Sequence, residues 1–196
     1  FLQYKNMVGA FYMPRMVYIN IHSLLSLPNL QFASGMGEII KHGLIRDASY
    51  YQWLKDHQAA IQAHDEDILE EMVYGSCLIK KNVVETDPKE QGIRAYLNFG
   101  HTIGHAIEKM SDFSLYHGQC VAIGMHSGAY LSFKRGHITK DQYEDILAMI
   151  QGFDLPVSVS DYDAGEILAN TKSDKRWWAI RSNLLYWKKS GRQLST

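Results

Sequence analysis

The chain has 196 residues, a formal net charge of −1, 46% hydrophobic residues and 21% charged residues. This length is sufficient for one domain with a substantial core, or for two small ones. The near-zero charge gives no general attraction to nucleic acid or to an anionic membrane surface, and no apolar run is long enough to span a bilayer. The two cysteines, Cys77 and Cys120, lie in apolar stretches, which favours a reduced, cytoplasmic protein.

The first residues contain one predicted strand and no features of a natural N-terminus. Met16 to Ile19 is rich in β-branched and aromatic residues between Pro14 and Asn20, so we predict a short strand there. The chain starts without Met and shows neither a basic n-region nor a small-residue cleavage site. We interpret the chain as part of a longer one.

Helical periodicity dominates the first half of the remaining sequence. Ser34 is a candidate N-cap for a helix to about Ile45, and Asp47 for the next one. Asp65 opens a long helix with an acidic first turn, which ends near Asp87 because a proline follows.

The second half continues this pattern and includes an apolar, glycine-containing segment that predicts a closely packed helix. Thr139 and Gln142 match a capping box. We assign residues 22–196 to one mainly α domain and leave the aromatic, basic tail without a predicted structure. The predicted helices run from Asn98 to about Met110, from 121 to 133, from Thr139 to Gln151, and onward from Ser160 or Asp161.

The run NFGHTIGHAIE, residues 98–108, is the strongest local signal for chemistry. His101 and His105 are four residues apart and share one face of a helix. Gly100 and Gly104 have the same spacing and allow another backbone to come close. An isolated pair of this kind is more often structural than metal-binding, so the pair alone does not define a site.

A third histidine and one carboxylate strengthen the metal hypothesis. His117 precedes the apolar helix, and Glu38 lies among apolar residues, where a carboxylate is costly to bury unless it is paired or binds a cation. Two imidazoles and one carboxylate are a standard zinc ligand set for a catalytic site. Spacing alone leaves His105 open as a further ligand.

Several cations accompany these motifs. Their ordinary interpretation is a solvated basic face, and the sharper one is a pocket that grips carboxylate or phosphate groups of an anionic substrate. The residues are Lys41, Lys80, Lys81, Arg94 and Lys175.

Four ordered motifs resemble the 3-dehydroquinate synthase family of sugar phosphate cyclases. They are KNMVGAFYMP, SGMGEIIKHGLI, SCLIKKNVVETDPKEQGIRAYLNFGHTIGHAIE and HGQCVAIGM. Members of the family join an N-terminal α/β nucleotide-binding domain to a multihelical C-terminal domain. The resemblance implies that residues 22–196 are the C-terminal domain, and that residues 1–21 are a linking segment with a short strand left from the N-terminal domain.

The resemblance also implies an activity. Family members are phosphorus–oxygen lyases of the shikimate pathway, and full-length proteins form homodimers. They use NAD and a divalent metal, zinc or cobalt, to convert the phosphorylated sugar acid 3-deoxy-arabino-heptulosonate 7-phosphate into 3-dehydroquinate. This chain has no Gly-rich phosphate loop after a strand, so we expect it to be inactive without an NAD-binding half.

Roles for individual residues follow from the resemblance alone. Glu38, His101 and His117 would hold the metal, and His105 would lie near it and either assist proton transfer or hold a substrate oxygen. The substrate would be bound by Lys41, Lys80, Arg94, Asn98 and Lys175, and Glu90 would orient this cluster. NAD would be reached by Lys5, Asn6, Ser23, Leu24, Leu25 and Ser26.

The sequence departs from the family pattern at three places. Leu30-Gln31 stands where the family has Arg-Glu, Gln119 where it has Glu, and Arg176-Trp177 where it has Lys before a Gly-rich turn. These changes leave three alternatives open. The chain could belong to another cyclase, such as a 2-deoxy-scyllo-inosose synthase, to a metal-dependent polyol dehydrogenase, or be a non-catalytic helical module.

Overall fold

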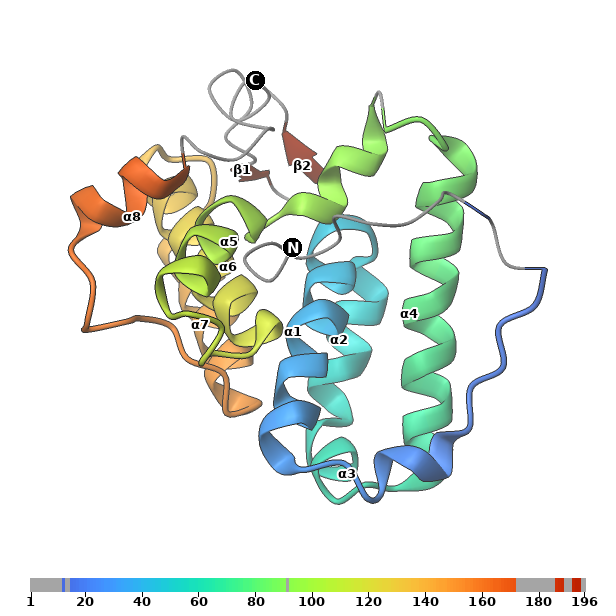
Figure 1. Ribbon diagram of the computed structural model, residues 1–196. Helices are drawn as coiled ribbons and strands as arrows, with labels where there is room; N and C mark the ends of the chain where they lie inside the picture. The colour runs from blue at the N-terminus through green and yellow to red at the C-terminus, as the bar shows by residue number, and fades with distance from the viewer. Residues whose placement is uncertain (1–11, 13–14, 91, 172–185, 189–191, 195–196) are drawn as a thin grey trace.

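The predicted mainly α fold is confirmed. The computed structural model describes residues 12, 15–90, 92–171, 186–188 and 192–194. A short antiparallel ribbon, β1 (Tyr186–Lys188) and β2 (Arg192–Leu194), accompanies the helices (Figure 1). The helical elements are η1 (Ile21–Leu24), α1 (Asn29–Arg46), α2 (Ala48–Asp56), α3 (Gln58–Gln62), α4 (Glu66–Thr86), η2 (Ile93–Asn98), α5 (His101–Met110), α6 (His117–Lys134), α7 (Lys140–Gly152) and α8 (Ala164–Thr171). Among the described helices, none combines the length and apolarity required to cross a bilayer.

Capping residues set several helix starts as predicted. The Asp47 carboxylate accepts hydrogen bonds from two backbone N–H groups at the start of α2, and Asp65 accepts one at the start of α4. Thr139 and Gln142 form the capping box of α7, each side chain accepting from the other's backbone N–H. These side chains satisfy N–H groups that have no partner within the helix.

Other boundaries differ from the predictions, one through a tertiary contact and two through local structure that the sequence signals did not identify. Helix α1 starts at Asn29 after Pro28, so Ser34 lies inside it and its hydroxyl accepts a hydrogen bond from another helix instead of capping. Helix α5 starts at His101, three residues later than predicted, because a 3-10 turn precedes it. Helix α8 starts after Asp163, whose carboxylate accepts from the N–H of Gly165, rather than at Ser160 or Asp161.

The strand predicted for Met16 to Ile19 is absent. These residues have no regular secondary structure, and the exposed fractions of Met16 and Tyr18 are 82% and 81%. A strand needs a neighbouring strand for its backbone hydrogen bonds. No strand pairs with this segment in the described part of the chain, so its β-prone composition has no effect there.

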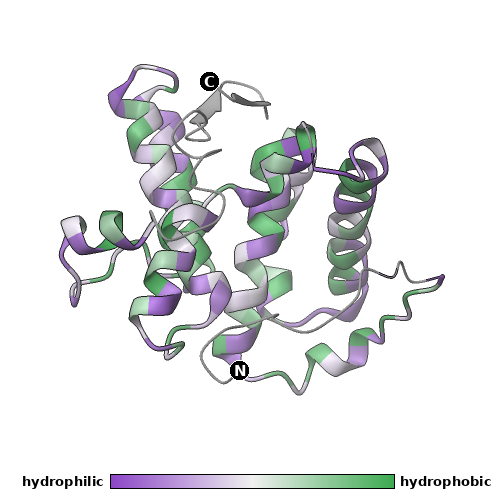
Figure 2. Cartoon of the chain, turned by 45° about the horizontal axis from the view of Figure 1, so that its top comes forward, coloured by the Kyte–Doolittle hydropathy of each residue, from purple (hydrophilic) through white to green (hydrophobic). Residues whose placement is uncertain are grey.

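The helices form two groups that meet at α1 and α6. Helices α1, α2 and α4 stand side by side, and α5 to α8 form the second group (Figure 1). Each helix carries hydrophobic and hydrophilic residues along its length, which is typical of helices packed on one side (Figure 2). The main core joins both groups. It includes Met36, Ile40 and Leu44 of α1, Leu69 and Met72 of α4, Val121 and Met125 of α6, and Ile146 and Ile150 of α7.

Candidate metal centre and substrate cavity

Glu38, His101 and His117 come from three helices and converge on one point. Oε1 of Glu38 lies 3.5 Å from Nε2 of His101 and 3.5 Å from Nε2 of His117. Two ligands about 2.1 Å from a common tetrahedral ion are separated by about 3.4 Å. Oε1 of Glu38 is also buried without a hydrogen-bond partner. The three predicted ligands are therefore brought together, and their geometry fits a divalent cation.

His105 lies next to this set. Its ring centroid is 5.2 Å from that of His101 and 5.8 Å from that of His117. One ring nitrogen from each of the three histidines lies within 4.8 Å of the other two. Three histidines are thus a second possible ligand set. The set with Glu38 fits better, because Oε1 of Glu38 is buried, lacks a hydrogen-bond partner and needs one.

In both candidate imidazole ligands, Nδ1 contacts a hydrogen-bond acceptor that orients the ring. Nδ1 of His101 lies 3.2 Å from the carbonyl oxygen of Phe99, and Nδ1 of His117 lies 3.1 Å from Oε2 of Glu108. Each acceptor requires a proton on Nδ1, which leaves the Nε2 lone pair directed at Glu38. Glu108 belongs to the motif that contains the histidine pair, but its contact with His117 on another helix could not be inferred from spacing.

Close contacts between helix backbones bring the ligands together. A Cβ atom on Gly118 would lie 1.8 Å from the carbonyl oxygen of Ser34, so α6 can start against α1 only with glycine at this position. The N–H of Gly118 also donates to Oγ of Ser34 at 3.0 Å. A Cβ atom on Gly104 would lie 3.0 Å from the carbonyl of Cys120. The predicted close backbone approach at Gly104 is confirmed.

A buried ammonium group sets the electrostatics of Glu38. Nζ of Lys41 donates to Oε2 of Glu38 at 2.6 Å, and Lys41 is only 1% exposed. Burial opposes ionisation of Glu38, but the neighbouring His117 ring and the Lys41 charge outweigh it and hold the Glu38 pKa well below its usual range. Burial lowers the pKa of Lys41, and Glu38 partly offsets this effect. Glu38 is thus ionised at neutral pH, as a metal ligand must be.

A polar cavity of about 210 Å³ opens beside the candidate metal centre. Glu38 and His101 line it, together with cationic side chains from α1, α4 and η2. This arrangement suits an anionic ligand with one end at the metal position. The remaining lining residues are Lys41, His42, Lys80, Glu90, Arg94, Leu97 and Asn98.

The loop before α5 places three of the predicted substrate residues. The Asp87 carboxylate accepts from the N–H groups of Gly92 and Arg94 at 2.7 and 3.1 Å, which folds the loop back on the end of α4. Nδ2 of Asn98 donates to Oε1 of Glu90 at 2.8 Å. The expected contact between Glu90 and the cluster is therefore present.

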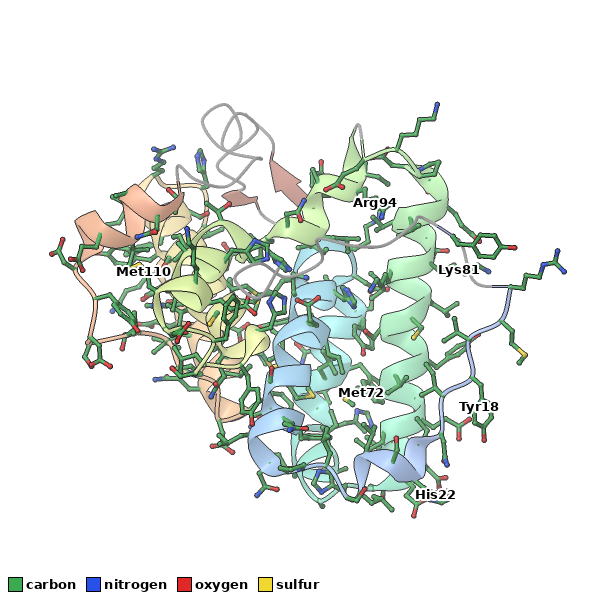
Figure 3. The ribbon with its side chains drawn as sticks, viewed as in Figure 1. Tyr18, His22, Met72, Lys81, Arg94 and Met110 are labelled. Carbon is green, nitrogen blue, oxygen red and sulfur yellow. The ribbon has the colours of Figure 1, made fainter. Side chains whose placement is uncertain are left out.

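The residues expected to reach NAD lie elsewhere or outside the described part of the chain. Ser23 and Leu24 lie in η1, Leu25 and Ser26 follow it, and none of the four lines the cavity. In Figure 3, His22 of η1 lies at the opposite end of α4 from Arg94. The role of residues Ser23 to Ser26 in NAD binding stays a prediction. Lys5, Asn6 and Lys175 lie outside the described residues.

The departures that fall within the described residues do not disturb this site. The Gln119 side chain accepts from the N–H of Tyr116 at 3.0 Å, a capping role that Gln performs as well as Glu. Leu30 lies eight residues before Glu38, about 12 Å along α1, and is 58% exposed. Arg176 and Trp177 lie outside the described residues.

His42 is a cavity residue that sequence reasoning missed. It is 5% exposed, and its Nδ1 lies 2.8 Å from Oγ of Ser76 on α4. Burial and the Lys41 charge lower the pKa of His42 to about 4, with Glu38 opposing and Lys80 reinforcing the shift. His42 is therefore neutral at pH 7. Its pairing with Ser76 could not be read from the sequence because the residues are 34 positions apart.

We expect His42 to make the chain sensitive to acid. Between pH 6.5 and 4 the unfolded chain takes up a proton at this histidine and the folded chain does not, so stability falls as the pH falls. From pH 7 to pH 4, the free energy of unfolding of the wild type should decrease by about 3 kcal/mol more than that of His42→Asn. Urea unfolding at a series of pH values measures this difference, and parallel curves would contradict it.

Comparisons with known proteins agree with this geometry. The family model for the C-terminal domain of 3-dehydroquinate synthase matches residues 35–177. The 3-dehydroquinate synthase of Syntrophotalea carbinolica is 46% identical over 175 residues, which cover 89% of this chain and 48% of that protein. The enzyme of Symbiobacterium thermophilum is 37% identical over 187 residues, covering 94% of this chain and 51% of that protein. The chain belongs to the 3-dehydroquinate synthase family, and it spans about half the length of these curated relatives.

Solved structures share the fold. A 2-epi-5-epi-valiolone synthase from Streptomyces hygroscopicus subsp. jinggangensis, with NAD+ and Zn2+ bound, matches with a TM-score of 0.89 at 20% identity, covering 100% of this chain and 55% of that one. A 2-deoxy-scyllo-inosose synthase complexed with carbaglucose-6-phosphate, NAD+ and Co2+ matches with a TM-score of 0.83 at 22% identity, covering 98% and 54%. At these identities the likeness establishes the helical fold alone.

Proposed function

We propose that this chain is the metal- and substrate-binding part of a 3-dehydroquinate synthase. The complete enzyme would convert 3-deoxy-arabino-heptulosonate 7-phosphate into 3-dehydroquinate and phosphate in the cytoplasm, as a homodimer. The observation that carries the proposal is the convergence of Glu38, His101 and His117 beside a cation-lined cavity. Sequence relatives with this name cover most of the chain, which favours this substrate over those of the structural neighbours.

In this proposal, Glu38, His101 and His117 hold a zinc or cobalt ion through Oε1 and the two Nε2 atoms. A bound divalent ion supplies Lewis acidity to hydroxyl and carbonyl oxygens of the substrate. His105 would move a proton to or from a substrate oxygen bound at this centre, since its ring neighbours those of both histidine ligands.

The cavity residues of this chain bind and orient the substrate. Lys41, Lys80 and Arg94 provide the positive charge for its carboxylate and phosphate groups. Asn98, held by Glu90, offers an amide to a hydroxyl group. Lys175 joins this set in the proposal on the family resemblance alone.

The oxidation and reduction steps require NAD, which we assign to a nucleotide-binding half that precedes residues 22–196 and is linked through residues 1–21. Lys5, Asn6 and the residues Ser23 to Ser26 would contact the nucleotide from this side. Alone, the chain should bind zinc without turning over substrate.

The test is an assay of the complete enzyme with the sugar-acid phosphate, NAD and zinc. We expect release of inorganic phosphate together with 3-dehydroquinate. Oxidation of a simple polyol without phosphate release would instead identify a polyol dehydrogenase, and phosphate release only from a hexose phosphate would identify a different cyclase. A preparation without metal and without activity would support a non-catalytic helical module.

A further inference from the structure

Glu108 is a buried carboxylate of α5 that contacts the candidate ligand from α6. It is 6% exposed, and its Oε2 lies 3.1 Å from Nδ1 of His117. Glu108 is seven residues after His101, so both side chains lie on one face of α5. Glu108 thus shares a face of α5 with the candidate ligand His101 and contacts the candidate ligand His117 on α6.

The two imidazole ligands differ in what holds them. Nδ1 of His101 faces a neutral carbonyl oxygen, that of Phe99, whereas Nδ1 of His117 faces a charged carboxylate. A carboxylate partner orients the ring and makes Nε2 a stronger electron donor than a carbonyl does. His117 is also the more exposed of the two, with 36% of its side chain accessible against 13% for His101. Because fewer neighbours enclose the His117 side chain, its orientation depends more on a hydrogen-bond partner.

The charges around the candidate metal centre also indicate that Glu108 supports metal binding. A divalent cation placed beside the buried Lys41 ammonium would bring three positive charges together, and Glu38 alone offsets only one of them. Glu108 supplies a second negative charge from behind His117 without occupying a ligand position. The open ligand positions thus stay available to substrate oxygens.

We propose that Glu108 is a positioning residue that holds His117 in the Nδ1–H tautomer and strengthens metal binding through that ring. This inference rests on the proposed function, because it concerns the same metal centre. A purely structural Glu108 would tie α5 to the start of α6 and affect folding, but it would leave zinc affinity unchanged in a folded variant.

Zinc titration calorimetry of the full chain separates these roles. We expect Glu108→Ala to weaken zinc binding about 10–100-fold, and Glu108→Gln to weaken it less, because an amide oxygen still accepts from Nδ1. Glu144→Gln is the matched control, since Glu144 is an exposed helical glutamate 3.2 Å from Lys140. Its zinc dissociation constant should equal that of the wild type.

The outcomes distinguish the inference from the proposed function. Loss of zinc binding in Glu38→Gln, with wild-type affinity in both folded Glu108 variants, would overturn the role of Glu108 and leave the metal centre standing. A wild-type chain that binds no zinc would overturn both. Circular dichroism and thermal unfolding without metal establish whether each variant is folded.

A measurement on the wild type decides the matter if the alanine variant does not fold. In spectra of chain labelled with 15N at histidine, zinc should leave His117 bound through Nε2, with a proton on Nδ1 protected from exchange by Glu108. Zinc bound to Nδ1 of His117, or an Nδ1 proton that exchanges as fast as in free histidine, would refute the proposal.

Discussion

Replacing His101 by alanine should remove the bound metal and the activity of the complete enzyme together. Its Nε2 is 3.5 Å from Oε1 of Glu38, and it is the more buried of the two imidazole ligands. Burial and the Lys41 charge lower the His101 pKa to about 3, so no proton competes with a metal at neutral pH. If about 12 kcal/mol of zinc affinity is shared by three ligands, loss of one weakens binding about a thousandfold.

The measurement is metal content by elemental analysis together with phosphate release in the complete enzyme. His22→Ala is the control, because His22 is an exposed histidine that pairs with Glu66 at 2.8 Å and lies outside the cavity. The control should keep its metal and its activity. Retained activity in His101→Ala would contradict the metal centre, and retained metal without activity would show that His101 acts on substrate instead.

Local sequence signals were sufficient for several features that depend on neighbours along the chain. Asp47 and Asp65 cap helices because their side chains reach N–H groups two or three residues away. His101 and His105 share a face because helical spacing places them there. The family resemblance, not the spacing, singled out Glu38, His101 and His117 as one set.

Contacts between distant segments were not predictable in this way. Serine is a residue type that often caps helices, yet the Ser34 hydroxyl accepts a hydrogen bond from the backbone N–H of Gly118, 84 residues later. The bond between His42 and Ser76 joins two helices in the same manner. Sequence patterns show which face of a helix is apolar, but they do not show which residue of another helix faces it.

The predicted strand shows that local composition can also indicate an element that the tertiary structure does not form. Residues 16–19 have strand-forming composition but pair with no strand in the described part of the chain. Strand propensity reflects packing against partners more than an intrinsic backbone preference, so composition alone did not decide the outcome.

Gly118→Ala should damage both the fold and the metal centre. The added Cβ would lie 1.8 Å from the carbonyl oxygen of Ser34, so α1 and α6 must separate. We expect a loss of about 3 kcal/mol in the free energy of unfolding, the upper end of ordinary overpacking. The separation also moves His117 away from Glu38, and zinc affinity should fall about tenfold or more. Urea unfolding without metal and zinc titration measure the two effects.

Gly35→Ala is the matched control because Gly35 is also a helical glycine and is next to Ser34. A Cβ atom there would meet nothing within 4 Å. Alanine is favoured over glycine inside a helix by about 1 kcal/mol, so this variant should be slightly more stable and bind zinc as the wild type does. If Gly118→Ala behaved like Gly35→Ala, the contact between α1 and α6 would not be what brings Glu38 and His117 together. Loss of zinc affinity in Gly118→Ala alone would tie the metal centre to this backbone contact.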